Sequence, residues 1–240
     1  VSLCEAVYDG QAVVENMTCR RCRSIDELST VWGRQEIPLL VDPEGKSIQM
    51  LQPWGVVDAI LAKKNLGTNR GMARHTVALG PGFTAGRDVD AVIETKRGHR
   101  LGRIIREGTA AANTGIPGII AGYGKERVIH SDAAGFVYGL VRIGDRVKKG
   151  QPMAVLTDVP IPDGMAITEA MGIPVPASLT GLVRGLIRDG YYAPKGFKIA
   201  DIDPREHEYH NCFTISDKAR CIAGSVVEIL LSEGVLPNTL

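Results

Sequence analysis

Two stretches in the second half of the chain share one pattern: GFVYGLVRIGDRVKKGQPMAVL at residues 135–156 and GLVRGLIRDGYYAPKGFKIADI at residues 181–202. They align without a gap at a constant offset of 46 residues (181 − 135 = 46). Short apolar runs alternate with glycines, which permit positive φ at bends, so both stretches indicate β-structure. The glycines in step are Gly135 with Gly181, Gly139 with Gly185, Gly144 with Gly190, and Gly150 with Gly196. One copy cannot cover its own apolar face, so the pattern predicts two copies packed as a pair of small curved sheets.

This region resembles biotinyl and lipoyl domains, whose architecture is the barrel-sandwich hybrid. The first copy contains the turn sequence GDRVKKG at residues 144–150, which matches the pattern of those domains. Carrier chemistry requires a lysine, because only a primary amine can form the amide to the cofactor. Residues 169–171 read Glu-Ala-Met, but Gly172 follows them, and residues 157–176 contain no lysine. The sequence therefore predicts a carrier-type fold without covalent biotin or lipoate.

The first half of the chain has helix signals and short apolar runs that are typical of an α/β layer. Residues 25–34 predict a short helix with Ser24 as its N-cap. Residues 37–41 predict a buried strand that ends in a turn at residues 42–45. Continuous apolar strands of this kind are typical of a sheet covered on both faces, so we interpret this part as Rossmann-like. Further strand candidates are residues 56–61, 77–79 and 91–93.

The strongest helical pattern lies after the repeats, at residues 216–233. Ser216 is a suitable N-cap, and Asp217 suits the first turn of a helix. A β-domain offers no place for such a helix, so we expect it to pack on the α/β layer. Its predicted apolar stripe comprises Ala219, Ile222, Ala223, Val226, Val227 and Leu230.

The repeats, the apolar runs of the first half and the C-terminal helical pattern together predict the fold class and the domains. The fold class is α/β plus all-β: a Rossmann-like α/β domain with an inserted barrel-sandwich hybrid domain. The α/β domain comprises residues 1–124 and is completed by the C-terminal segment 206–240. The inserted domain comprises residues 125–205 and is built from the two repeats.

The overall composition argues against two kinds of partner. Lys and Arg total 28 while Asp and Glu total 27, so the sequence lacks the excess of cations that nucleic acid binding requires. No run of 18 apolar residues exists, so no membrane span is expected. The chain begins at Val1 without a signal-peptide pattern, and its five cysteines are unevenly spaced. These features favour a reducing, cytoplasmic location.

The segment GPGFTAG at residues 80–86 is a candidate ligand-binding loop between two predicted strands. Glycines there let backbone N–H groups converge on an anion such as phosphate, at the strand ends where α/β sheets bind ligands. It is not a G-x-G-x-x-G segment that opens a long helix, so it is no ordinary dinucleotide fingerprint. A purely structural turn is the alternative. The candidate cofactor-binding residues are Gly80, Gly82, Phe83, Thr84 and Gly86.

A polar, basic stretch follows the next predicted strand, at residues 94–103. Its cations could hold an anionic ligand, and its glutamate could hold a ribose hydroxyl or orient the histidine. The alternative is a solvated basic loop. Parallel strands would bring this stretch, the glycine loop and the end of the 56–61 strand to one edge of the sheet. The candidate residues added here are Glu94, Arg97, His99, Arg103, Lys63 and Asn65.

Two further clusters are candidate sites. Cys19 and Cys22 flank two arginines and could form a redox pair, a metal half-site, or a site that handles sulfur or selenium. A single C-x-x-C is weak support, and unremarkable surface cysteines are the alternative. His207 and His210 invite a metal interpretation, but such a loop is usually polar surface. We predict no metal site.

Several stretches are similar to the selenium-dependent molybdenum hydroxylase system protein family. They include EAVYDG, IPLLVDPEG, VVDAILAKKNLGT, NTGIPG, KERVIHSDAAG, DIDPR, TISDKAR and the long block ALGPGFTAGRDVDAVIETKRGHRLGRII. The resemblance implies a cytoplasmic accessory protein with Rossmann-like and barrel-sandwich parts that serves maturation of a molybdenum hydroxylase. Family members begin with a strand and a glycine-rich turn upstream of EAVYDG, and nothing corresponding precedes Val1 here. A nucleotide site would be incomplete if that piece were lost.

The resulting functional hypothesis is a maturation protein that binds the molybdenum pterin dinucleotide cofactor or a related nucleotide. Its expected partners are a molybdenum hydroxylase, the maturation factors of that enzyme and an anionic small molecule. Two alternatives remain open: a nicotinamide-dependent oxidoreductase of the Rossmann type, and a scaffold that docks the hydroxylase without catalysis. The sequence decides neither whether the protein is an enzyme nor whether it forms a homo-oligomer.

Overall fold

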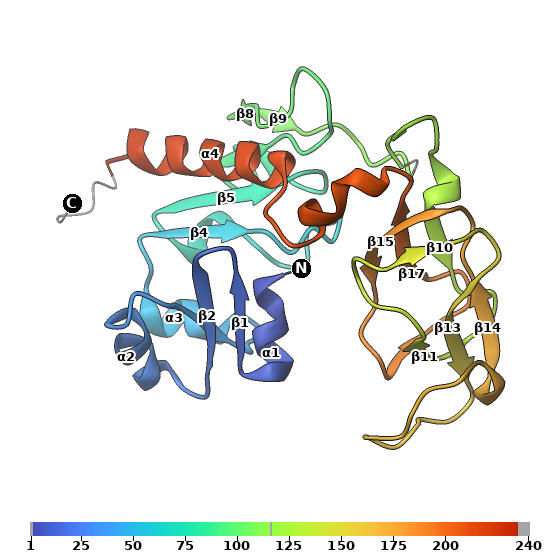
Figure 1. Cartoon of the computed structure of the whole chain (residues 1–240). Helices are drawn as coiled ribbons and strands as arrows, with labels where there is room; N and C mark the ends of the chain where they lie inside the picture. Colours follow the sequence, from blue (N-terminus) through green and yellow to red (C-terminus); the bar gives the residue numbers. More distant parts are fainter. Residues whose placement is uncertain (1, 116, 235–240) are drawn as a thin grey trace. The chain divides into compact units, whose positions relative to one another are not determined.

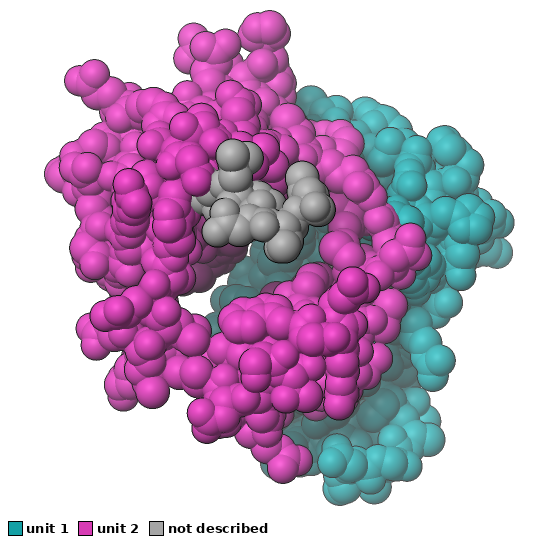
Figure 2. Space-filling view, turned by 90° about the vertical axis from the view of Figure 1, so that its left-hand side faces the viewer, with its two compact units in different colours: residues 1, 115–214 teal, residues 2–114, 215–240 magenta. Residues whose placement is uncertain are grey.

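The structure is a computed structural model that describes residues 2–115 and 117–234 (Figure 1). The chain divides into two compact units, coloured in Figure 2. Unit 1 comprises Val1 and Gly115–Thr214, and unit 2 comprises Ser2–Thr114 and Ile215–Leu240. The domain boundaries expected from the sequence, at residues 124/125 and 205/206, stay a prediction about separately folding domains. Residues 235–240 of the expected C-terminal segment and Val1 lie outside the described residues.

Unit 1 consists mainly of two four-stranded antiparallel sheets. Their strand orders are β10-β17-β15-β12 and β14-β13-β11-β16. Strands of both repeats occur in each sheet, so neither repeat forms a sheet alone. The strands are β10 (Val128–His130), β11 (Gly135–Gly139), β12 (Arg146–Val147), β13 (Pro152–Thr157), β14 (Ile173–Pro176), β15 (Gly181–Leu186), β16 (Tyr191–Ala193) and β17 (Lys198–Asp203). Short 3-10 helices are η4 (Lys125–Arg127), η5 (Glu169–Met171) and η6 (Glu206–Cys212).

The two repeats fold alike. β11 and β15 start at equivalent positions, and β13 and β17 have identical lengths at the 46-residue offset. Gly144 and Gly190 both have positive φ, at 95° and 78°, and Gly150 and Gly196 have φ of 85° and 79°. These are the bends that the glycine spacing predicts, and only glycine adopts them without strain. One core cluster unites both copies, with Val137 and Met153 from the first and Val183 and Ile202 from the second.

Unit 2 contains three small sheets instead of one continuous one. The first has the order β1-β2-β3, the second β4-β5-β7-β8, and the third pairs β6 with β9. The strands are β1 (Gln11–Val14), β2 (Met17–Cys22), β3 (Ile37–Leu40), β4 (Gly55–Asp58), β5 (His75–Leu79), β6 (Thr84–Ala85), β7 (Ala91–Ile93), β8 (Ile104–Ile105) and β9 (Gly108–Thr109). The helices are η1 (Leu3–Glu5), α1 (Ala6–Asp9), η2 (Ile25–Glu27), α2 (Leu28–Trp32), α3 (Lys46–Leu51), η3 (Arg70–Met72) and α4 (Asp217–Ser232).

The second of these sheets positions the candidate site. β4, β5 and β7 run parallel, and β8 returns antiparallel to β7. On one face, Ile222 and Ile229 of α4 pack with Val77 and Ile93. The other face is covered by irregular chain through Phe83 and its neighbours. β7 is buried throughout and apolar, β5 is mostly buried but contains the polar Thr76, and β4 is only partly buried.

The predicted fold class, a Rossmann-like α/β domain with an inserted barrel-sandwich hybrid domain, is wrong. A Rossmann-like layer requires long crossover helices on both faces of one sheet. Here α1, α2 and α3 have only four to six residues each, and the link from β4 to β5 contains only the 3-10 turn η3. The short parallel runs were correctly located, but they are divided among separate sheets.

Some local predictions also need correction. The expected helix at residues 25–34 is a 3-10 turn followed by α2, and Ser24 makes no side-chain capping bond. The expected strand at residues 56–61 ends at Asp58. Ser216 does cap α4, since its side chain accepts a hydrogen bond from the Ala219 N–H at 3.1 Å. The expected stripe of α4 is partly wrong, because Val227 is exposed whereas the buried positions are Ile222, Ser225 and Ile229. No helix in the described part of the chain has both the length and the apolar character to cross a bilayer.

Candidate functional site

Three loops meet where the parallel strands of unit 2 end, and we call them together the carboxyl edge: residues 59–65 after β4, residues 80–86 after β5, and residues 94–103 after β7. The contacts are close. A Cβ placed on Gly82 would lie 2.6 Å from the Cα and N atoms of Lys64. A Cβ placed on Gly80 would lie 2.6 Å from Oγ1 of Thr95. The middle loop therefore touches both of its neighbours, as the parallel order predicts.

Two backbone N–H groups of the glycine loop, residues 80–86, have no acceptor among the described residues. Gly80, Gly82 and Gly86 have φ of 80°, 109° and 86°, which explains why glycine occupies these positions. The N–H groups of Gly80 and Gly86 donate to the carbonyls of Ile93 and Val89, both at 2.8 Å. Among the described residues, no acceptor is found for the consecutive N–H groups of Gly82 and Phe83. Adjacent free amides of this kind can bind an anion.

Two of the predicted loop residues serve the loop's own structure. The Phe83 side chain is buried and packs with Ala78 and Val92 of the sheet, so it anchors the loop. The Thr84 N–H donates to the Asp88 carboxylate at 2.8 Å. Whether either contacts a ligand stays a prediction.

Both carboxylates at the carboxyl edge are occupied by internal hydrogen bonds. Glu94 is buried and accepts from the backbone N–H groups of Lys96 at 2.7 Å and Ala111 at 2.8 Å. Asp58 is also buried and accepts from the Ile60 N–H and from the hydroxyl of Thr68. These carboxylates fix the loops. The hypothesis that Glu94 holds a ribose hydroxyl or orients His99 therefore finds no support in this geometry.

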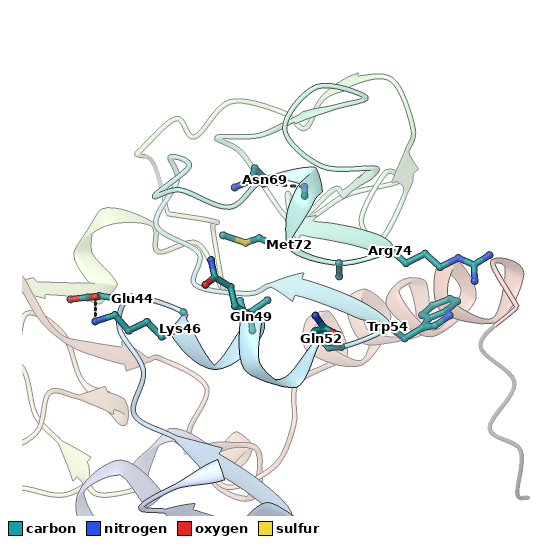
Figure 3. A pocket seen from close by; sticks show the side chains of 13 residues that line it. Glu44, Lys46, Gln49, Gln52, Trp54, Asn69, Met72 and Arg74 are labelled. Carbon is teal, nitrogen blue, oxygen red and sulfur yellow. Dashed lines mark hydrogen bonds and ion pairs between the residues drawn. The ribbon is translucent and has the colours of Figure 1, made fainter.

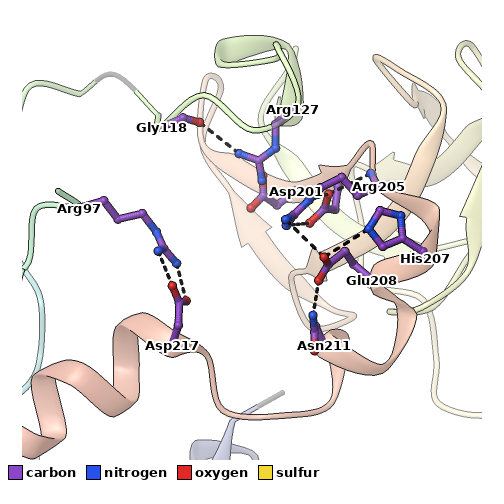
Figure 4. A network of polar contacts seen from close by, with 10 residues as sticks. Arg97, Gly118, Arg127, Asp201, Arg205, His207, Glu208, Asn211 and Asp217 are labelled. Carbon is purple, nitrogen blue, oxygen red and sulfur yellow. Dashed lines mark hydrogen bonds and ion pairs between the residues drawn. The ribbon is translucent and has the colours of Figure 1, made fainter.

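The predicted cations differ in their availability. Arg97 forms a two-pronged ion pair with Asp217 at the start of α4, with N–O distances of 2.7 and 2.8 Å (Figure 4). Asn65 holds its own turn, since its side chain donates to the Thr68 carbonyl and accepts from the Gly67 N–H, each at 2.8 Å. The remaining basic side chains of the edge are exposed and have no side-chain partner in the part of the chain that the structure describes: Lys63, Lys64, Lys96, His99, Arg100 and Arg103.

Sequence reasoning missed Lys64, Lys96 and Arg100, although all three lie in segments that it singled out. The signal that could have found them is the parallel order itself. Every exposed cation that directly follows a parallel strand reaches the same edge. The pattern of charges alone did not separate Arg97, which is paired, from Arg100 and Arg103.

The cysteine pair is not a redox site in this structure. Cys19 and Cys22 lie three residues apart on the extended strand β2, so their Cα atoms are about 10 Å apart, beyond the ~7 Å that a disulfide tolerates. Burial raises the pKa of the Cys19 thiol, with smaller contributions from Cys4 and Cys22. The flanking arginines have other partners, since Arg20 is paired with Glu36 and Arg21 donates to the carbonyl of Val7.

His207, near the end of the second repeat, joins an ion-pair network within unit 1 (Figure 4), whereas His210 contacts the Tyr209 ring. His207 is exposed and lies 3.5 Å from Glu208, which also contacts Arg205. Arg205 in turn binds the buried Asp203 through two nitrogens, at 3.0 and 2.8 Å. Burial raises the pKa of Asp203, but the hydrogen bonds from Arg205 outweigh burial and leave the pKa below its usual value. In the described residues, no group of three or more His, Cys, Asp or Glu side chains could hold a metal ion.

Comparisons with known proteins add one clear relative. No family model matches the chain. The chain is 47% identical over 231 residues to the uncharacterized protein YqeB of Escherichia coli strain K12, which covers 96% of this chain. The chain spans only 40% of that relative's length.

Solved structures show a weak likeness. The ectoine utilization protein EutE (DoeB) from Ruegeria pomeroyi is 16% identical with a TM-score of 0.27, and covers 42% of this chain and 28% of its own. A succinylglutamate desuccinylase/aspartoacylase from Rhodobacter sphaeroides is 14% identical with a TM-score of 0.26, covering 42% and 30%. An aspartoacylase family protein from Mesorhizobium loti is 14% identical with a TM-score of 0.28, covering 53% and 42%. At these scores the likeness carries no argument about activity.

These findings correct the family prediction. The predicted membership of the selenium-dependent molybdenum hydroxylase system protein family is wrong, since no family model matches the chain and the relative that covers 96% of it does not bear that family's name. The maturation function inferred from it is wrong as well. Neither alternative, the nicotinamide-dependent oxidoreductase or the hydroxylase scaffold, gains support. The absence of covalent biotin or lipoate and the anionic ligand stay predictions, and the oligomeric state stays undecided.

Proposed function

We propose that unit 2 binds a small molecule that carries phosphate, with the phosphate held at the carboxyl edge. The observation that supports this most is an imbalance of available charge. Five exposed cations and one imidazole surround the edge without side-chain partners in the described residues. Both carboxylates of the edge, Asp58 and Glu94, are buried and engaged by internal donors.

The backbone favours phosphate over a simple carboxylate. The adjacent N–H donors of Gly82 and Phe83 favour an anion that has several acceptor oxygens. The cations that lack side-chain partners among the described residues come from two different loops, so the anion would be contacted from more than one side. A tetrahedral dianion can contact donors on several sides at once, whereas a planar carboxylate offers one edge. Because internal donors engage both Asp58 and Glu94, neither carboxylate is available as an acid or base, and the geometry supports binding.

The expected affinity is modest for a bare ion. Exposed cations each contribute only about 0.2–1 kcal/mol. Four or five of them with two amides give a dissociation constant on the order of 1 mM for inorganic phosphate. Pyrophosphate can reach more cations and should bind about tenfold more tightly.

Calorimetric titration at low ionic strength with phosphate, pyrophosphate and citrate tests the proposal. The informative variant is Lys63→Gln/Lys64→Gln, which should weaken pyrophosphate binding by about tenfold, equivalent to about 1.4 kcal/mol. The matched control is Lys148→Gln/Lys149→Gln, an adjacent exposed lysine pair in unit 1. If pyrophosphate fails to bind at about 10 mM, or if both double variants weaken it equally, the site is not at this edge.

A further inference from the structure

A pocket of about 720 Å³ lies at the opposite end of the same strands (Figure 3). One wall is α3 with the following residues 52–54, which lead into β4. The other wall is residues 69–74, which lead into β5. The pocket is therefore at the amino ends of β4 and β5 and is separate from the carboxyl edge. Its volume falls within the range of about 300–1,000 Å³ that is typical of small-molecule sites.

One end of the pocket carries a fixed aromatic ring and a cation, Trp54 and Arg74 (Figure 3). The Trp54 ring lies on the His75 ring with centroids 4.2 Å apart and an angle of 31° between their planes. His75 is itself mostly buried and lies 3.8 Å from Glu233. Since the ring is held by this stack, Trp54 presents a preorganised surface for a planar group.

Some polar side chains of the pocket are engaged in internal hydrogen bonds or ion pairs, and others have no partner among the described residues. Asn69 caps η3, because its side chain accepts from the Gly71 N–H at 3.0 Å, and Lys46 pairs with Glu44 at 2.6 Å. Within the described ranges, by contrast, no partner is found for the carboxamides of Gln49 and Gln52 or for the guanidinium of Arg74. Gln52 is the C-cap of α3, where it has a left-handed backbone with φ of 45° and its N–H donates to the Ile48 carbonyl.

The pocket side chains without a partner among the described residues indicate which chemical groups a ligand would need. A carboxamide offers a donor and an acceptor side by side, which matches the edge of a heterocyclic ring or an amide. A guanidinium binds a carboxylate or phosphate through two parallel hydrogen bonds. An aromatic face stacks on a planar ring. We propose that this pocket binds a small organic anion whose planar ring has hydrogen-bonding edges. Arg74 would bind the anionic group and Trp54 would stack on the ring. Gln49 and Gln52 would form hydrogen bonds with the edge of the ring.

Trp54 supplies a direct readout. The chain has two tryptophans, so Trp32→Phe leaves a single indole N–H resonance, that of Trp54. Trp32 is exposed and belongs to α2, outside the pocket. The probes are orotate, which has a charged planar hydrogen-bonding ring, uracil, which lacks the charge, and benzoate, which lacks the hydrogen-bonding edge. We expect orotate to shift the resonance saturably, and uracil and benzoate to bind at least about tenfold more weakly.

Two variants test whether orotate binds in this pocket. Arg74→Gln should weaken orotate binding by about tenfold, because it removes the charged hydrogen bonds. The matched control is Arg100→Gln, another exposed arginine without a side-chain partner among the described residues, which lies at the carboxyl edge. A thermal melt of each variant checks that the fold is retained. The proposal is overturned if orotate causes no saturable shift, if uracil or benzoate binds equally well, or if Arg100→Gln weakens orotate as much as Arg74→Gln. Because Lys63→Gln/Lys64→Gln should leave orotate binding unchanged, failure here is distinguishable from failure of the phosphate site.

Discussion

Replacing Gly82 by alanine tests the packing on which the carboxyl edge depends. The φ of Gly82 is 109°, which costs an L-residue about 1–3 kcal/mol in strain. The added Cβ would also lie 2.6 Å from the Cα and N of Lys64 and 2.8 Å from the carbonyl carbon of Lys63. These are backbone atoms and cannot rotate away, so overpacking adds about 1–3 kcal/mol. We expect Gly82→Ala to lower the free energy of unfolding of unit 2 by about 2–6 kcal/mol.

Gly98→Ala is the matched control for this experiment. Gly98 lies in the neighbouring loop of the same edge and has φ of 130°, but a Cβ there would meet nothing within 4 Å. It should therefore show only the strain, about 1–3 kcal/mol. Urea unfolding followed by tryptophan fluorescence is the assay, because both tryptophans, Trp32 and Trp54, belong to unit 2. Equal losses in the two variants would refute the close contact between the glycine loop and residues 63–64, and with it the geometry of the phosphate site.

Three further outcomes follow from the ion pairs and from the repeats. Arg97→Gln should cost only about 0.2–1 kcal/mol of stability, since its pair with Asp217 is exposed, and should leave pyrophosphate affinity unchanged; a tenfold loss in titration would show that Arg97 binds the ligand. Asp203 has a lowered pKa in the folded protein, so its contribution to stability is complete above its ordinary pKa of about 3.9 and is lost as pH falls through the folded pKa. Stability curves between about pH 5 and pH 2 should thus be flatter for Asp203→Asn than for the parent, and identical slopes would contradict this assignment. Gly172→Ala should destabilise unit 1 by about 1–3 kcal/mol, because its Cβ would collide with a carbonyl of β13; an unchanged melting temperature would show that this strand can shift.

The structure shows why the sequence could place some of the candidate residues at one edge of the sheet. Lys63 and Arg103 follow β4 and β7, of which the apolar pattern located β7 correctly and β4 only in part, and parallel pairing brings them to one edge. The role predicted for Glu94 finds no support in the geometry, because the sequence does not reveal that a backbone N–H seventeen residues away, at Ala111, donates to its carboxylate. The Trp54 pocket was missed entirely. Its walls come from two segments that contain no recognisable motif, and only the fold of unit 2 places them face to face.

The sequence by itself determined the local geometry that glycine imposes. Glycines at a fixed spacing favour the same bends in both repeats, and Gly144, Gly150, Gly190 and Gly196 have those bends, because glycine adopts positive φ without the strain that other residues incur. Tertiary structure alone decided how the short strands are grouped into sheets, which carboxylates are used internally, and which cations remain available. Those outcomes depend on partners far away in the chain, and each contributes free energy only after packing has brought the partners together.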